Sequence, residues 1–232
     1  MESQYPIKPI SLENVSTYSL AERKSKVHAD MFARPLDGSE NVLGLISKLP
    51  HILAGDSLRT LIKAILYARA TGKPIIWGLG GHVIKVGLGA VLNDLMDSGF
   101  ITGIAMNGSA AIHDFEVALR GSTSEEVEEV LGSGQFGMAR ETSEFMNGAI
   151  NRGAAHSLGI GESLGNLLSD ATSWKLETPY KELSLLVHAY EKRIPVTVHV
   201  AIGTDIIHAH PDATGEAIGK ASHQDFRRSE EH

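Results

Sequence analysis

The chain has 232 residues, a formal net charge of −7 and no cysteine. The lack of cysteine excludes disulfides, thiolate nucleophiles and cysteine-based zinc or iron–sulfur sites. Lysine and arginine are scattered rather than clustered, so we expect no nucleic-acid partner bound through a basic face. Hydrophobic residues make up 42% of the sequence, which is enough to build a full core.

The first residues, MESQYPIKPISLENV, lack the basic segment and the apolar stretch of a signal peptide. No apolar run approaches the roughly 20 residues that a membrane-spanning helix needs. We therefore predict a cytoplasmic protein without a membrane partner.

The N-terminal part is polar and irregular, and we predict an arm over residues 1–40. Two helices are expected after it, over residues 41–49 and 55–70, the first stopped by Pro50. The second helix carries apolar residues at helical spacing, which predicts a buried stripe formed by Leu58, Leu61, Ile62, Ile65 and Leu66.

The central segment alternates apolar runs with glycine-containing polar turns. Apolar runs over residues 74–77 and 101–106 predict strands, and amphipathic patterns after each of them predict helices. In parallel α/β sheets, ligands bind outside the carboxyl ends of the strands. Both polar turns follow strands, so we expect a ligand site there.

Further elements complete a predicted α/β domain over residues 41–232. We expect a three-layer α/β/α arrangement with a mostly parallel, Rossmann-like sheet. A helix start is predicted at residues 122–126. The other predicted elements are helices over residues 139–155, 161–169 and 178–193, a strand over 195–200 that we extend to 207, and a last helix from 215.

The first polar turn contains Gly78, Gly80 and Gly81, followed by His82. Glycines at such a point let backbone N–H groups approach the phosphate of a dinucleotide. A tight turn that packs a helix against a strand needs glycine equally. The spacing is not G-x-G-x-x-G, so both interpretations stay open.

The second polar turn contains Asn107, Gly108 and Ser109. Their side chains can hydrogen-bond a ligand, although Asn and Ser are also favoured as helix N-caps in the absence of any ligand. His113, Asp114 and Glu116 follow within one helical turn, and His113 and Glu116 are neighbours at i and i+3. A His–Glu pair can act as a general base and the group that orients it, so we predict that these three residues are catalytic.

A second group of histidines lies near the C-terminus. His208 and His210 form an H-x-H pattern, which is a legitimate arrangement for zinc, iron or nickel. A metal-dependent hydrolase that uses His113, Asp114, His208 and His210 is therefore an alternative hypothesis. A turn with two exposed histidines explains the pattern as well, and we favour it.

Residues 75–119 carry a strand with Gly-Leu, a glycine turn, a second strand and a glycine-containing turn followed by His-Asp. This order resembles the deoxyhypusine synthase family, in particular its archaeal-type members, and the resemblance returns at Ile194-Pro195-Val196. It implies a cofactor, NAD, held by the two polar turns, and an amine substrate. It also implies a homodimer or homotetramer and a cofactor contact from Asp205, after a small shift in the alignment.

Two departures from the family pattern separate this chain from the authentic synthases. Met106 and Asn107 stand where threonines are usual, and no Gly-Gly-x-Pro-Lys segment with the Schiff-base lysine occurs, because the chain ends before it. We therefore predict a synthase-like protein that binds NAD or another nucleotide and acts on a small polar substrate, with hydride removal next to an amine nitrogen as the implied chemistry. A non-catalytic oligomeric binding protein is the further alternative.

Overall fold

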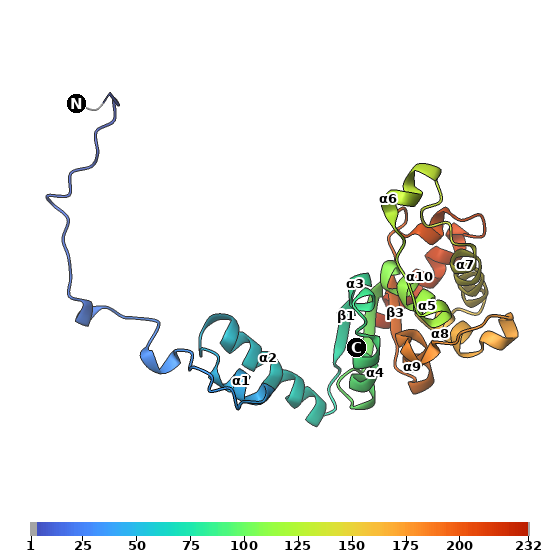
Figure 1. Ribbon diagram of the computed structural model, residues 1–232, viewed down its shortest axis with the longest axis horizontal. Helices are drawn as coiled ribbons and strands as arrows, with labels where there is room; N and C mark the ends of the chain where they lie inside the picture. The colour runs from blue at the N-terminus through green and yellow to red at the C-terminus, as the bar shows by residue number, and fades with distance from the viewer. Residues whose placement is uncertain (1–3, 232) are drawn as a thin grey trace. The chain divides into compact units, whose positions relative to one another are not determined.

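The computed structural model describes residues 4–231 of the chain (Figure 1). It divides into two compact units, one up to Lys63 and one from Ala64 onward. The division falls inside helix α2 (Leu53–Ala70) rather than at the end of the expected arm at residue 40.

Most side chains of the N-terminal unit are exposed to solvent. Residues 4–40 form only two short 3-10 turns, Leu20–Glu22 and Ala29–Met31. Helix α1 (Val42–Lys48) begins after Asn41, whose side chain accepts a hydrogen bond from the Gly44 amide at 3.0 Å. In the described part of this unit no hydrophobic side chain is buried. The predicted stripe of α2 therefore lies partly in solvent, contrary to our expectation.

The second unit contains a parallel sheet of three strands in the order β1-β2-β3. The strands are β1 (Ile76–Leu79), β2 (Gly103–Asn107) and β3 (Val196–His199). Ile76 aligns with Gly103, and Ile104 aligns with Val196. This arrangement confirms the predicted α/β class with a parallel sheet.

Helices connect and follow these strands, and α5, α8, α9 and α10 contact the sheet. Figure 1 shows α5, α8 and α9 gathered beside β3. The helices are α3 (Gly81–Lys85), α4 (Gly89–Asp97), α5 (Gly108–Arg120), α6 (Val127–Val130), α7 (Arg140–Ala155), α8 (Ile160–Ser169), α9 (Leu185–Lys192) and α10 (Gly215–Ser229), with 3-10 turns at Leu131–Ser133, Ala171–Trp174, Lys181–Leu183 and Ile206–Ala209.

The structure corrects three predicted elements. The helix expected after the glycine turn is two helices, because Gly87 adopts a φ of 78° between α3 and α4. The helix expected over residues 178–193 begins only after Ser184, whose hydroxyl accepts from the Val187 amide and caps α9. The strand does not extend to residue 207, since the chain turns after His199 and Thr204 N–H bonds to Ala201 O at 3.1 Å.

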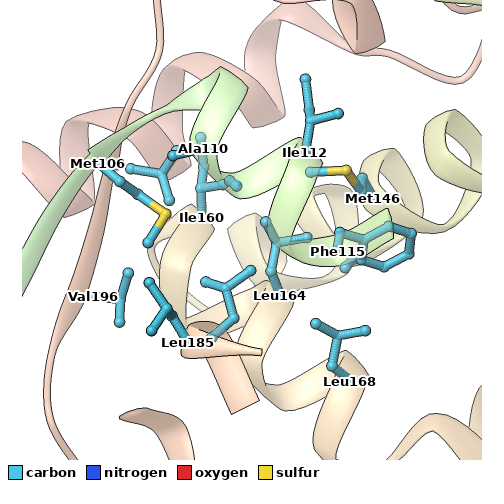
Figure 2. Packing of buried hydrophobic residues seen from close by; sticks show 14 of the residues in the cluster. Met106, Ala110, Ile112, Phe115, Met146, Ile160, Leu164, Leu168, Leu185 and Val196 are labelled. Carbon is cyan, nitrogen blue, oxygen red and sulfur yellow. The ribbon is translucent and has the colours of Figure 1, made fainter. Parts of the chain in front are cut away.

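The hydrophobic core lies between the sheet and the helices that cover it. Figure 2 shows Ile160, Leu164 and Leu168 of α8 beside Met106 of β2 and Phe115 of α5. Leu164, Leu168 and Phe115 are completely inaccessible to solvent. Burying a side chain of this size contributes about 1.5–3 kcal/mol, so the second unit supplies most of the stability of the chain.

Asp225 of α10 closes the outer edge of β3. Its Oδ2 atom accepts hydrogen bonds from the amides of Val198 (2.9 Å) and Gly161 (3.0 Å). The first amide belongs to the edge strand and the second to the N-terminal turn of α8. Burial raises the pKa of Asp225 to about 6. One carboxylate thus occupies an edge at which another strand could otherwise pair.

Candidate functional site

A cleft of about 250 Å³ opens near the carboxyl ends of the strands. It lies between α5, the segment that follows α5, and the turn that follows β3. The polar and charged groups that line it include Lys85, Ser109, His113, Glu116, Glu125 and Asp205. A larger depression, of about 510 Å³, lies at the amino end of β3. We place the candidate site in the smaller cleft, because ligands of parallel sheets bind at the carboxyl edge.

The glycines of the first turn lie where the sequence placed them, but their neighbours are protein atoms. A Cβ on Gly81 would collide with Ser109 Oγ and would lie 2.8 Å from Cδ2 of His113. A Cβ on Gly80 would lie 3.5 Å from the side-chain nitrogen of Asn107. The turn therefore packs α3 closely against α5. Only Gly78, inside β1, has open space where a side chain would be. His82 is exposed on α3.

The residues of the second turn also make contacts within the protein. Asn107 ends β2, and its Oδ1 accepts a hydrogen bond from the Ala110 amide at 2.9 Å, which caps α5. Gly108 and Ser109 begin that helix. A Cβ on Gly108 would collide with the carboxylate of Asp205, so this acidic group lies at the N-terminus of α5. Burial raises the pKa of Asp205, although His208 nearby acts in the opposite direction.

The structure brings His113 and Glu116 together through a third residue. His113 Nδ1 lies 3.8 Å from Glu116 Oε2, which is too far for a hydrogen bond. Thr123 lies between them: its Oγ1 is 2.7 Å from His113 Nδ1 and donates a short hydrogen bond to Glu116 Oε2. The other carboxylate oxygen of Glu116 accepts from Thr142 Oγ1 of α7 at 3.2 Å.

Glu116 remains ionised despite its position. Burial raises its pKa, but His113 and the hydroxyls of Thr123 and Thr142 more than compensate, so the net pKa lies below the ordinary value. The His113 and Glu116 side chains are only 13% and 18% exposed. A half-buried, ionised carboxylate is thus linked through a hydroxyl to an imidazole that lines the cleft.

Asp114 lies away from this group. It is buried on the other side of α5, where its carboxylate accepts from Ser184 Oγ (2.6 Å) and from the amides of Leu185 (2.8 Å) and Leu186 (3.1 Å). Burial raises the pKa of Asp114. These contacts hold the N-terminus of α9 against α5, so the structure gives Asp114 a packing role and does not bring it to the cleft.

The histidines near the C-terminus do not assemble with α5. His210 Nδ1 lies 3.4 Å from Asp212 Oδ2, and both ring nitrogens of His208 are buried without a hydrogen-bond partner. Among residues 4–231, no three His, Asp or Glu side chains form a group that could hold a metal ion. The metal-hydrolase alternative therefore has no assembled ligand set in the part of the chain that the structure describes.

The sequence did not indicate that Thr123, Glu125 and Thr142 belong to the site. The first two lie in the helix start that the sequence predicts at residues 122–126, because Ser, Thr and Glu are typical there. In the structure α6 begins only at Val127, and the carboxylate of Glu125 accepts from the Gly137 amide at 3.2 Å. No local pattern pairs Thr142 with Glu116 across 26 residues.

Comparisons with known proteins return similarities of fold only. No family model and no curated protein matches the sequence. One similar structure is described as a "conserved putative LOR/SDH protein" from Methanococcus maripaludis S2, with a TM-score of 0.46 and 18% identity over 90% of this chain. Another is described as a "putative deoxyhypusine synthase" from Entamoeba histolytica, with a TM-score of 0.42 and 12% identity over 72% of this chain.

These alignments cover 54% and 63% of the two known structures. The chain thus spans between about half and two thirds of the length of these two proteins. The second of them is described as a "putative deoxyhypusine synthase", which is the family that residues 75–119 resemble in sequence. Within residues 4–231, no helix has both the length and the apolar character needed to cross a membrane.

Proposed function

We propose that the cleft at the carboxyl edge of the sheet binds a small molecule with a protonated amine, and that His113 is the general base that acts on it. The observation that carries this proposal is the chain of contacts from Glu116 through Thr123 to His113 at the cleft wall. A base that is linked to a half-buried carboxylate is a common arrangement in proton-transfer sites.

The charges around the cleft favour a cation. Three carboxylates line it, those of Glu116, Glu125 and Asp205, against one ammonium group, that of Lys85. Charges interact more strongly in a cleft than on an open surface, because the protein walls of the cleft lower the local dielectric constant. A cationic ligand is therefore attracted, and a small diamine is compatible with a volume of about 250 Å³.

The proposed chemistry begins with proton transfer. An ammonium group has no free electron pair, so it becomes reactive only after it loses a proton. His113 Nε2 would take this proton, and the imidazolium that forms would be stabilised by the negative charge of Glu116 through Thr123. The products of the step are a neutral amine in the cleft and a charged imidazole in the wall.

The polar turns fit a cofactor phosphate less well. The space at Gly81 is filled by Ser109 and His113, and the N-terminus of α5 already faces the carboxylate of Asp205. A phosphate at that helix end would meet a like charge. NAD binding, which the family resemblance implies, thus stays a prediction, and the proposed proton transfer uses only residues of this chain.

A thermal-shift titration tests the proposal. We expect 1,4-diaminobutane to raise the Tm of the protein saturably, because a ligand that binds only the folded state stabilises it by mass action. 1,4-Butanediol has the same length without charge and should give no shift. A parallel titration with NAD tests the cofactor prediction separately.

Matched variants locate the binding. Glu125→Gln keeps an acceptor for the Gly137 amide but removes one negative charge, and we expect diamine affinity to fall about threefold to tenfold. Glu128→Gln, on the exposed face of α6 outside the cleft, is the control and should leave the affinity unchanged. Equal shifts with the diol and the diamine, or no loss in Glu125→Gln, would contradict the proposal.

A further inference from the structure

We infer that Thr123 is a positioning residue: its hydroxyl holds His113 in the tautomer whose unprotonated Nε2 serves the cleft. The inference rests on the role proposed for His113 and adds the residue that makes this role possible. It concerns the state of the imidazole in the free protein, so it can be tested whether or not a ligand is known.

The direction of the hydrogen bonds follows from counting protons. A threonine hydroxyl has one proton to donate and lone pairs to accept with, whereas an ionised carboxylate can only accept. The Thr123 proton is therefore directed to Glu116 Oε2. In the hydrogen bond of 2.7 Å between His113 Nδ1 and Thr123 Oγ1, the imidazole must then be the donor. A neutral His113 thus carries its proton on Nδ1.

The count requires that Glu116 is ionised. Its two oxygens accept from Thr123 and Thr142, and it has no proton to give back. Because its pKa lies below the ordinary value, this state holds at neutral pH. A protonated carboxyl group would allow the opposite direction for every bond in the chain of contacts.

Thr123 is also the only link between the two groups in the described structure. The direct separation of 3.8 Å between His113 Nδ1 and Glu116 Oε2 leaves no hydrogen bond if the hydroxyl is removed. Thr142 cannot replace it, because it contacts the other oxygen of Glu116 from α7. Without Thr123, no hydrogen bond within residues 4–231 selects one tautomer of His113.

The second ring nitrogen is left for a ligand. No hydrogen bond to His113 Nε2 occurs among the described residues, and the side chain lines the cleft. With the proton on Nδ1, Nε2 presents a lone pair and acts as a base. With the proton on Nε2, the same position would donate a hydrogen bond and could not accept a proton from a substrate.

A purely structural role for Thr123 predicts a different pattern of effects. If the residue only held the segment between α5 and α6 in place, valine, which has the same shape, would serve nearly as well, and the state of His113 would not respond. If the hydroxyl positions the imidazole, serine would serve and valine would not.

The test is nitrogen-15 NMR of the histidine side chains in the full chain, at a pH where the imidazoles are neutral. His113→Gln assigns the His113 signals. We expect the Nδ1–H tautomer to be the majority form in the unchanged protein and in Thr123→Ser. In Thr123→Val it should fall to a minority, with unchanged far-ultraviolet circular dichroism.

Other outcomes are equally informative. A majority Nε2–H tautomer in the unchanged protein, or an unaltered tautomer in Thr123→Val, would overturn the inference. If Thr123→Val does not fold, Thr123→Ala replaces it, since alanine also removes the hydroxyl; an unaltered tautomer there would also overturn the inference. Failure of diamine binding with the expected tautomer would refute only the proposed ligand.

Discussion

The two units of the chain contain helices with similar apolar patterns but opposite surroundings. In α8, Leu164 and Leu168 are fully buried against the sheet and its neighbouring helices. In the part of α2 that belongs to the first unit, Leu58 is 39% exposed and Leu61 is 56% exposed. Both helices were predicted from the same kind of periodicity, and both are present.

The difference shows that periodicity predicts a helix but not what covers it. Isolated helices are marginal in water, and most helices in proteins are stabilised by packing of their apolar face. In the N-terminal unit, polar contacts supply part of this stabilisation: Arg59 of α2 donates to the carbonyls of Pro50 (2.8 Å) and Ile46 (3.0 Å).

The homodimer or homotetramer implied by the family resemblance stays a prediction.

The largest difference in the free energy of unfolding should come from truncating one leucine in α8 and one in α2. Leu164→Ala removes a fully buried side chain and should lower the free energy of unfolding by about 2–5 kcal/mol. Leu61→Ala removes a side chain that is 56% exposed and should change it by less than about 0.5 kcal/mol. Urea unfolding of both variants measures the difference, and equal losses would mean that α2 is covered in solution.

A pH-dependent contrast should come from Asp225. Burial raises its pKa from 3.8 to about 6, so the folded state binds this proton more tightly than the unfolded state. The stability that this proton contributes is fully present below the pKa of Asp225 in the unfolded chain. It is lost as the pH rises through the pKa of Asp225 in the folded protein. The loss amounts to at most about 3 kcal/mol.

Asp225→Asn isolates this effect, because the amide oxygen can still accept from Val198 and Gly161 but cannot ionise. Between about pH 4 and pH 7, urea unfolding should shift the stability difference in favour of the variant by up to about 3 kcal/mol. A constant difference for Asp225→Asn would mean that the carboxyl group is hydrated.

The smallest contrast concerns two helix caps with the same chemistry. Asn107 caps α5 through the Ala110 amide, and Asn41 caps α1 through the Gly44 amide. Asn107→Ala should lower the free energy of unfolding by about 1 kcal/mol, because α5 belongs to the core. Asn41→Ala should reduce only the helix signal, without a change in the main unfolding transition. Equal effects on that transition would show that the two units unfold together.

Local signals in the sequence predict much of this fold. The apolar runs identify all three strands of the described sheet, and the amphipathic patterns identify the long helices α2, α7, α8 and α10. The errors lie where a single residue decides the outcome. Gly87 divides one predicted helix, and Ser184 delays the start of another.

The site was predictable only in part, for a physical reason. The strand–turn–helix order places His113 and Glu116 at the carboxyl edge, because that edge is a property of parallel strands. The same helical turn carries Asp114, but its side chain points into the core, where Ser184 meets it. Thr123 and Thr142 reach Glu116 through tertiary packing, which spacing along the chain does not encode.

The most direct test of the account is a map of backbone amide shifts by NMR during titration with 1,4-diaminobutane. We expect saturable changes at the amides of Ser109, His113, Glu116 and Glu125, which line the cleft, and none along α2. Changes confined to α2 or to the amino end of β3, or no saturable change at all, would contradict the assignment of the carboxyl-edge cleft as an amine site.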